Sequence, residues 1–242
     1  TTTTKPPATT TTTKPPATTT TTKPPATTTT TKPPATKPYF TPDALELYIT
    51  SFQNQTFRTY LRWIGPDVKV GILGSPMEGD YDTLYQVTND LSNLIPNITF
   101  TLVNGEGDIT YKFLDESSFI GSEDCDNERN FWSSDGLYSG NALKKEVLCF
   151  KIGDHYKKGF STTNEQTIKE CRIYHLRASF LYALTNSWRD ADRDKFPNSY
   201  FAGMYCNNYQ KISNLDRQVL LIHYSDYVSN AETVDEVHSL LK

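Results

Sequence analysis

The sequence lacks any apolar run long enough to cross a bilayer. Its longest runs, such as Val219-Leu220-Leu221-Ile222, fall far short of the roughly 20 apolar residues that a spanning helix needs. It also lacks a strong charge excess, because 24 basic and 28 acidic residues leave a net charge of −4. We therefore expect no nucleic-acid partner and no transmembrane segment. No signal-peptide pattern stands at Thr1, so we expect a mature product or a fragment.

Cysteine is scarce, and its spacing excludes the usual zinc-binding pairs. The four cysteines are Cys125, Cys149, Cys171 and Cys206. They form no C-x-x-C pair, which suits disulfides better than zinc. Sequence proximity favours the pairing Cys125–Cys149 with Cys171–Cys206 among the three pairings that four cysteines allow.

What the sequence has in abundance is threonine and proline, at its N-terminal end. Four copies of the unit Thr-Thr-Thr-Thr-Lys-Pro-Pro-Ala-Thr fill residues 1–36. Each proline fixes φ and lacks an N–H, so residues 1–38 are expected to form an extended polyproline II tail. Such Thr-rich, Pro-spaced tracts are typical of O-glycosylated stalks, with a flexible linker as the plainer alternative. At about 3.1 Å per residue, the tail would span on the order of 120 Å.

We expect O-linked glycosylation of threonines and N-linked glycosylation of asparagines. The expected O-linked sites are Thr1, Thr2, Thr3, Thr4, Thr9, Thr10, Thr11, Thr12, Thr13, Thr18, Thr19, Thr20, Thr21, Thr22, Thr27, Thr28, Thr29, Thr30, Thr31 and Thr36. N-linked sequons begin at Asn54 and Asn97. The tail, the sequons and the even cysteine count together predict a secreted glycoprotein, extracellular or at the cell surface.

Residues 39–242 are rich in Tyr, Phe, Leu and Ile and are expected to form one α+β domain. Hydrophobic periodicity predicts helices over 42–53, 82–94, 163–184, 213–224 and 231–241. It predicts strands over 68–73, 98–103, 109–114 and 146–152, a hairpin loop over 104–108 and a long irregular loop over 115–140. Thr41 is expected to cap the first helix, and Thr163 with Gln166 the longest one. This order predicts a small mixed sheet with packed helices and a helical C-terminal half.

Three segments carry a resemblance to a group of uncharacterised secreted bacterial domains. Residues 62–70 (RWIGPDVKV) resemble their RW-x-x-P-V-x-V strand entry, and residues 89–92 (NDLS) resemble the helix that follows. Residues 214–224 (NLDRQVLLIHY) are similar to their L-T-x-L-D-R-A-L-L-R-x-L-Y ending. The resemblance covers about residues 58–228 and implies a degenerate zincin-like (metallopeptidase-like) fold. It implies no reaction, because the activity of those domains is itself unknown.

The same resemblance identifies residues 170–184 with the helix that carries H-E-x-x-H in zincins. That motif needs histidines at i and i+4, with a glutamate beside the first as base. Here Ser179 stands at the second histidine position of His175, and Leu176 replaces the glutamate. We therefore expect no metal, no cofactor and no catalytic residue. His155, His223 and His238 are dispersed and join no nucleophile pattern.

Two further sequence patterns, an aspartate run and an aromatic cluster, each have a functional and a structural interpretation. Asp190, Asp192 and Asp194 resemble the start of a calcium loop, although Lys195 stands where an EF-hand needs glycine, and a solvated loop explains the run. A dense aromatic cluster suggests a glycan- or protein-binding face, with core packing as the alternative. Its members are Trp188, Phe196, Tyr200, Phe201, Tyr205 and Tyr209.

These features predict a non-catalytic extracellular structural glycoprotein. We expect it to self-assemble as a homopolymer, a surface filament or matrix, through the folded domain and the glycosylated tail. The first alternative is a secreted glycan- or protein-binding module on a mucin-like stalk. The second is a diverged secreted hydrolase.

Overall fold

The computed structural model describes residues 40–53, 61–120, 125, 132–139, 142–158, 163–187, 191–202, 211–226, 228, 231 and 234–241. The chain divides into two units, Thr1–Pro34 and Ala35–Lys242, and the first lies wholly outside the described residues. The elements are α1 (Pro42–Gln53), β1 (Asp67–Gly74), α2 (Asp80–Leu94), β2 (Thr99–Asn104), β3 (Ile109–Leu114), α3 (Glu116–Ile120), β4 (Trp132–Ser139), β5 (Ala142–Lys151), α4 (Gly153–Lys158), α5 (Glu165–Thr185), the 3-10 helix η1 (Tyr200–Ala202), α6 (Asn214–His223) and α7 (Val234–Leu241).

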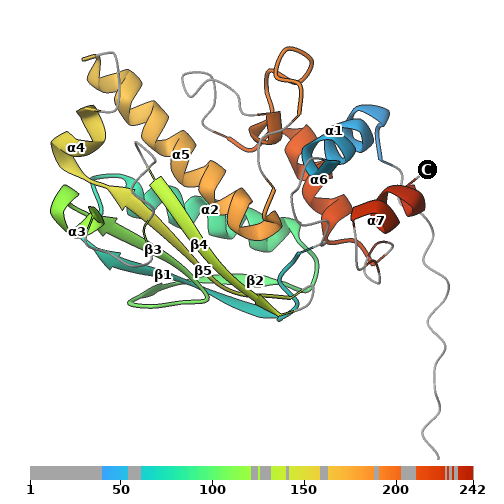
Figure 1. Ribbon diagram of the computed structural model, residues 1–242, viewed down its shortest axis with the longest axis horizontal. Coiled ribbons are helices and arrows are strands. Elements are labelled where there is room, and N and C mark those ends of the chain that lie inside the picture. The colour runs from blue at the N-terminus through green and yellow to red at the C-terminus, as the bar shows by residue number, and fades with distance from the viewer. Residues whose placement is uncertain are drawn as a thin grey trace, which may run out of the picture. The chain divides into compact units, whose positions relative to one another are not determined.

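The strands form one mixed five-stranded sheet in the order β2-β1-β3-β5-β4. β1 runs parallel to β2 and to β3, β3 runs parallel to β5, and β4 pairs antiparallel with β5. From α5 onward the described elements are all helical, and α6 and α7 lie beside α1 (Figure 1). The α+β class, the small mixed sheet and the helical C-terminal half are therefore confirmed.

The expected hairpin over residues 104–108 is wrong, because β2 and β3 lie on opposite sides of β1. The connection passes across β1: the Gly105 N–H donates to the Ile72 carbonyl, and the Asp108 carboxylate accepts the Lys69 N–H at 2.7 Å. A Cβ on Gly107 would lie 2.5 Å from the Lys69 carbonyl oxygen. Glycine is needed here for close backbone approach rather than for a hairpin turn.

The irregular loop expected over residues 115–140 is also wrong, since it contains α3 and β4, and β5 begins at Ala142. β4 reads WSSDGLYS, which shows no regular apolar alternation, and it is the last strand in the sheet order. Cys125 and Cys149 form a disulfide, the pair that sequence proximity favours. With Phe119 and Val147 these cysteines form a small buried cluster separate from the main core. Cys171 is also disulfide-bonded, and Cys206 lies outside the described residues.

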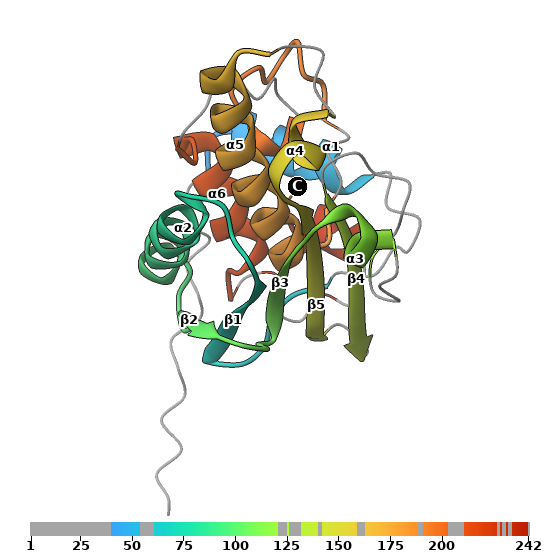
Figure 2. The ribbon, with the colours of Figure 1, turned by 90° about the vertical axis from the view of Figure 1, so that its left-hand side faces the viewer.

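The main core lies between the sheet and two helices, because α2 and α5 cover the same face of the sheet (Figure 2). Val70, Tyr111 and Phe150 face helix residues such as Phe180 in this core. α5 is buried on nearly all sides, and buried side chains donate to its backbone: the Tyr111 hydroxyl to Leu176 O at 3.2 Å and Trp63 Nε1 to Ala183 O at 2.8 Å. α5 is thus the central element of the domain.

The N-terminus of α1 is capped by the predicted residue, whereas the N-terminus of α5 is capped by a different one. The Thr41 hydroxyl accepts the Ala44 N–H, as predicted for α1. α5 is capped by Asn164, whose side chain accepts the Thr167 N–H, so the prediction of Thr163 is one residue early. None of the helices in the described ranges is long and apolar enough to cross a membrane.

Candidate functional site

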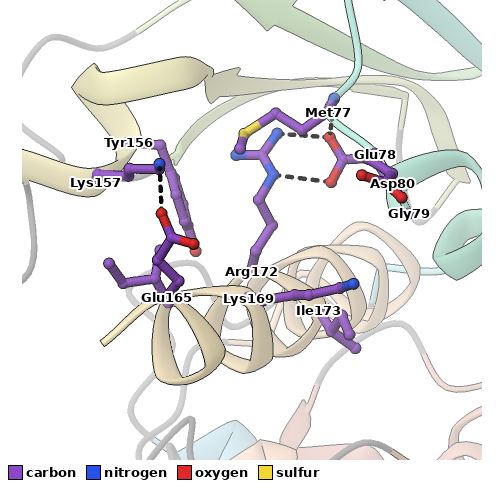
Figure 3. Close-up of a pocket in the computed structure, with 11 residues that line it drawn as sticks. Met77, Glu78, Gly79, Asp80, Tyr156, Lys157, Glu165, Lys169, Arg172 and Ile173 are labelled. Atoms are coloured by element: carbon purple, nitrogen blue, oxygen red, sulfur yellow. Dashed lines mark hydrogen bonds and ion pairs between the residues drawn. The ribbon is translucent and has the colours of Figure 1, made fainter. Parts of the chain in front are cut away.

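A pocket of about 260 Å³ lies beside the carboxyl ends of β1 and β5 (Figure 3). Its walls come from the loop before α2, from α4 and from the N-terminal half of α5. The loop leaves β1 at Gly74 and enters α2 at Gly79, and both glycines have positive φ angles, 84° and 85°. Open sheets with parallel strands place their ligands beyond the carboxyl ends of those strands, which makes this pocket the candidate site.

The floor of the pocket is a buried ion pair between Asp80 and Arg172. Arg172 Nε and Nη2 donate to the two carboxylate oxygens of Asp80 at 2.8 and 2.7 Å. Arg172 Nη1 donates to the Lys151 carbonyl at the end of β5, at 2.7 Å. The Asp80 carboxylate also accepts the Met77 N–H at 2.8 Å. This one pair therefore joins α5, the start of α2 and the end of β5.

Aromatic rings surround the Arg172 guanidinium. Its centre lies 4.5 Å from the ring of Tyr156, 5.6 Å from that of Phe113 and 5.7 Å from that of Phe150. Burial raises the pKa of Tyr156, and its hydroxyl lies 3.1 Å from His175 Nδ1 in a hydrogen bond. These contacts hold the guanidinium rigidly, since cation–π attraction strengthens away from water.

The rim of the pocket carries charges of both signs. Lys157 Nζ lies 3.5 Å from Glu165 Oε1, and both side chains are solvent-exposed (Figure 3). Lys169 and Glu78 are exposed on the same rim, while Ile168 supplies apolar surface. The arrangement suits binding of a small molecule or side chain that has apolar and charged parts.

His175 and Ser179, the helix positions that correspond to the two histidines of a zincin, face the protein interior. His175 is hydrogen-bonded to Tyr156, as described above. The Ser179 hydroxyl donates to Leu176 O at 2.9 Å and lies 3.3 Å from the Tyr111 hydroxyl. Burial raises the pKa of Tyr111, so its hydroxyl remains protonated. Within the described residues, no group of three or more His, Cys, Asp or Glu side chains could hold a metal ion.

His223 is buried between α1 and the segment before β1. Its Nε2 lies 2.8 Å from the Leu61 carbonyl, which can only accept, so Nε2 carries the proton. Nδ1 then accepts from the Tyr48 hydroxyl at 3.3 Å. Burial lowers the pKa of His223 to about 3. His155 and His238 lie in α4 and α7.

Those members of the aspartate run and of the aromatic cluster that lie within the described residues have structural roles. The Asp192 carboxylate accepts the N–H groups of Asp194 and Lys195, which makes a local turn. Phe196, Tyr200 and Phe201 are buried in the main core. The other members, Asp190, Trp188, Tyr205 and Tyr209, lie outside the described residues, as do Asn54 and all the tail threonines.

Sequence patterns missed the residues that make this pocket. Asp80 and Arg172 lie 92 residues apart, so no local spacing connects them. One signal was present: Arg172 stands among residues that a packed helix buries, and a buried arginine needs an acidic partner. That signal identifies Arg172 as one member of a buried ion pair, but it does not identify the acidic partner.

No protein-family model and no curated protein sequence matches the chain. Among solved structures, two structures of myroilysin match at 14% sequence identity and a TM-score of 0.32. The first match covers 68% of this chain and 95% of myroilysin, and the second covers 77% and 97%.

Proposed function

We propose that this chain is a non-catalytic extracellular structural glycoprotein that assembles with copies of itself. One geometric observation supports the proposal above the others: β4 is an edge strand with exposed apolar side chains. Leu137 and Tyr138 at its C-terminal end are 63% and 49% exposed. The resemblance to secreted bacterial domains and the Thr/Pro tail support an extracellular setting for the proposed assembly.

β4 has the properties of a strand that pairs with another strand. It pairs only with β5, and no other strand within the described ranges lies along its outer edge. Its eight residues contain no lysine and no proline, the residues that commonly protect sheet edges. Asp135 is their only charged residue, so two antiparallel copies of β4 would meet with little like-charge repulsion. A second copy of this chain is therefore the partner that we propose.

Pairing of β4 with β4 would be isologous and would close at a dimer. A filament or matrix needs a second, different contact. The Thr/Pro tail, with its reach on the order of 120 Å, is the element that we propose for it. Its five lysines and lack of acidic residues make it cationic, whereas residues 39–242 are acidic overall. This charge difference favours contact between the tail of one copy and the surface of another.

The experiment compares assembly of the full chain with two variants and one truncation. Leu137→Lys puts a charge on the proposed edge, and Ile64→Lys puts the same charge on an apolar residue that is 61% exposed elsewhere. We expect electron microscopy and sedimentation to show loss of assemblies for Leu137→Lys alone. A chain beginning at Lys37 should form dimers and no polymers. Unchanged polymers in the Leu137→Lys variant would refute the role of β4, and in the truncated chain the role of the tail.

The carboxyl-end pocket favours a second candidate, a binding module on a stalk. Three of the five Arg172 N–H groups are used in the hydrogen bonds described above, so an acceptor in the pocket could engage the others. A thermal-shift screen of amino acids and short oligosaccharides tests this candidate. A ligand of this pocket should stabilise the wild-type chain more than a Lys169→Ala variant. If every compound stabilised both chains equally, Lys169 on the pocket rim would have no part in binding.

A further inference from the structure

The sequon at Asn97 lies in an exposed turn between α2 and β2. Asn97 has φ 63°, a left-handed conformation that asparagine tolerates better than most residues. That conformation explains asparagine at this position, but it does not explain threonine two residues later. Asn97 and Thr99 are both exposed, and neither side chain has a hydrogen-bond partner among the described residues. The acceptor amide and the hydroxyl of the sequon are therefore both accessible.

A groove of about 440 Å³ borders Asn97. Its walls include Pro66 and Asp67 at the start of β1, Asn93 at the end of α2, and Pro96. Its volume falls within the range of small-molecule sites, so it has room for the first sugar of a glycan. Asn97 lies two residues before Thr99, the first residue of β2, so a glycan here begins beside the end of that edge strand.

The β2 edge is already closed in part by α2. The Thr99 N–H donates to Pro66 O on the β1 side, so the backbone groups of Phe100 point to the outer side. There Ser92 of α2 accepts the Phe100 N–H at 2.8 Å. The two edges of the sheet therefore differ: β2 is covered at its start by Ser92, and among the described residues β4 has no corresponding cover.

We propose that Asn97 carries an N-linked glycan that covers the β2 edge and limits pairing through the sheet to β4. The inference rests on the proposed function for the extracellular setting and for assembly through β4. In the modification, Asn97 Nδ2 forms a bond to C1 of the sugar. The bond from C1 to the diphosphate of a lipid-linked oligosaccharide donor breaks, the lipid diphosphate leaves, and the transferase takes one amide proton. Without the glycan, β2 of one copy could pair with β4 of another, a heterologous contact that does not close.

The experiment uses the full chain secreted from eukaryotic cells, with paired substitutions in the sequon. Thr99→Ser keeps the sequon and is the matched control for Thr99→Ala, which removes it. Asn97→Gly removes the acceptor and keeps the left-handed backbone without strain. Peptide mass spectrometry before and after an N-glycosidase should show a glycan on the Asn97 peptide of the wild-type and Thr99→Ser chains only. Mapping by peptide separates this site from the sequon at Asn54.

Sedimentation then tests what the glycan does. We expect Thr99→Ala and Asn97→Gly to form larger assemblies than Thr99→Ser, and Leu137→Lys to abolish assembly in each background. An unmodified Asn97 in the wild-type and Thr99→Ser chains overturns the modification, whether or not β4 mediates assembly. An occupied site with equal assembly sizes overturns the covering role. Loss of assembly in every chain would refute the proposed function and the covering role, while the mass spectrum would still decide occupancy.

Discussion

The Arg172 guanidinium and the Asp80 carboxylate form a two-point ion pair between α5 and the first residue of α2. The two hydrogen bonds measure 2.8 and 2.7 Å, and the side chains are 5% and 2% exposed. Such a pair adds little net stability relative to apolar residues, but it is costly to break because the remaining charge is buried alone. It joins the first residue of α2 to α5 at the floor of the pocket.

Replacing one partner of this pair should be strongly destabilising. We expect Asp80→Asn to lower the free energy of unfolding by about 3–5 kcal/mol, because Arg172 stays charged and buried. The double variant Asp80→Leu with Arg172→Met should recover more than half of that loss. Urea unfolding of the three chains measures both effects. A single variant as stable as the wild type would show that the pair is not buried in solution.

The buried His223 should make the domain less stable in acid. Its ordinary pKa is 6.5 and burial lowers it to about 3, so between these values the unfolded chain binds a proton that the folded chain does not. The free energy of unfolding should therefore fall as pH decreases from 6.5 toward 3, by up to about 1.4 kcal/mol per pH unit from this group. Urea unfolding at pH 7.5, 6.5 and 5.5 gives the slope. His223→Gln should flatten it, and identical slopes in the two chains would contradict this origin.

The Cys125–Cys149 disulfide should stabilise the segment that contains α3 and β4. It closes a loop with a sequence separation of 24, for which chain entropy predicts about 3 kcal/mol. We expect Cys125→Ala with Cys149→Ala to lose about that amount in thermal or urea unfolding. Peptide mapping without reduction checks the linkage directly. A double variant with unchanged stability would mean that the bond constrains the unfolded chain very little.

The crossing of residues 105–108 over β1 should tolerate no side chain at Gly107. A Cβ there would lie 2.5 Å from Lys69 O and 2.6 Å from Gly71 N, both backbone atoms. We expect Gly107→Ala to cost about 1–3 kcal/mol or more, as overpacking does. Gly65→Ala is the matched control, because its Cβ would meet only Asp67 O at 3.7 Å. Equal unfolding midpoints for the two variants would contradict the close approach.

Local patterns predicted elements more successfully than they predicted connections. The helix at 42–53 and its Thr41 cap were predictable because apolar spacing and capping act within a few residues. β4 was missed because its polar sequence makes sense only for a strand at the edge of a sheet. The pocket could not be predicted, because the partner of Arg172 is set by how α5 packs against α2.

The sequence by itself determined the helices with strong apolar periodicity, the β1 strand and the α+β class, because each depends on spacing within a short window. It also determined the Thr/Pro composition of the tail, from which no apolar core can be built. Only the tertiary structure decided that β2 and β3 flank β1, that Ser92 covers one sheet edge and that β4 forms the other. It also decided that His175 and Ser179 face the interior. These features depend on contacts between residues distant in sequence, and such contacts arise only when the whole domain packs.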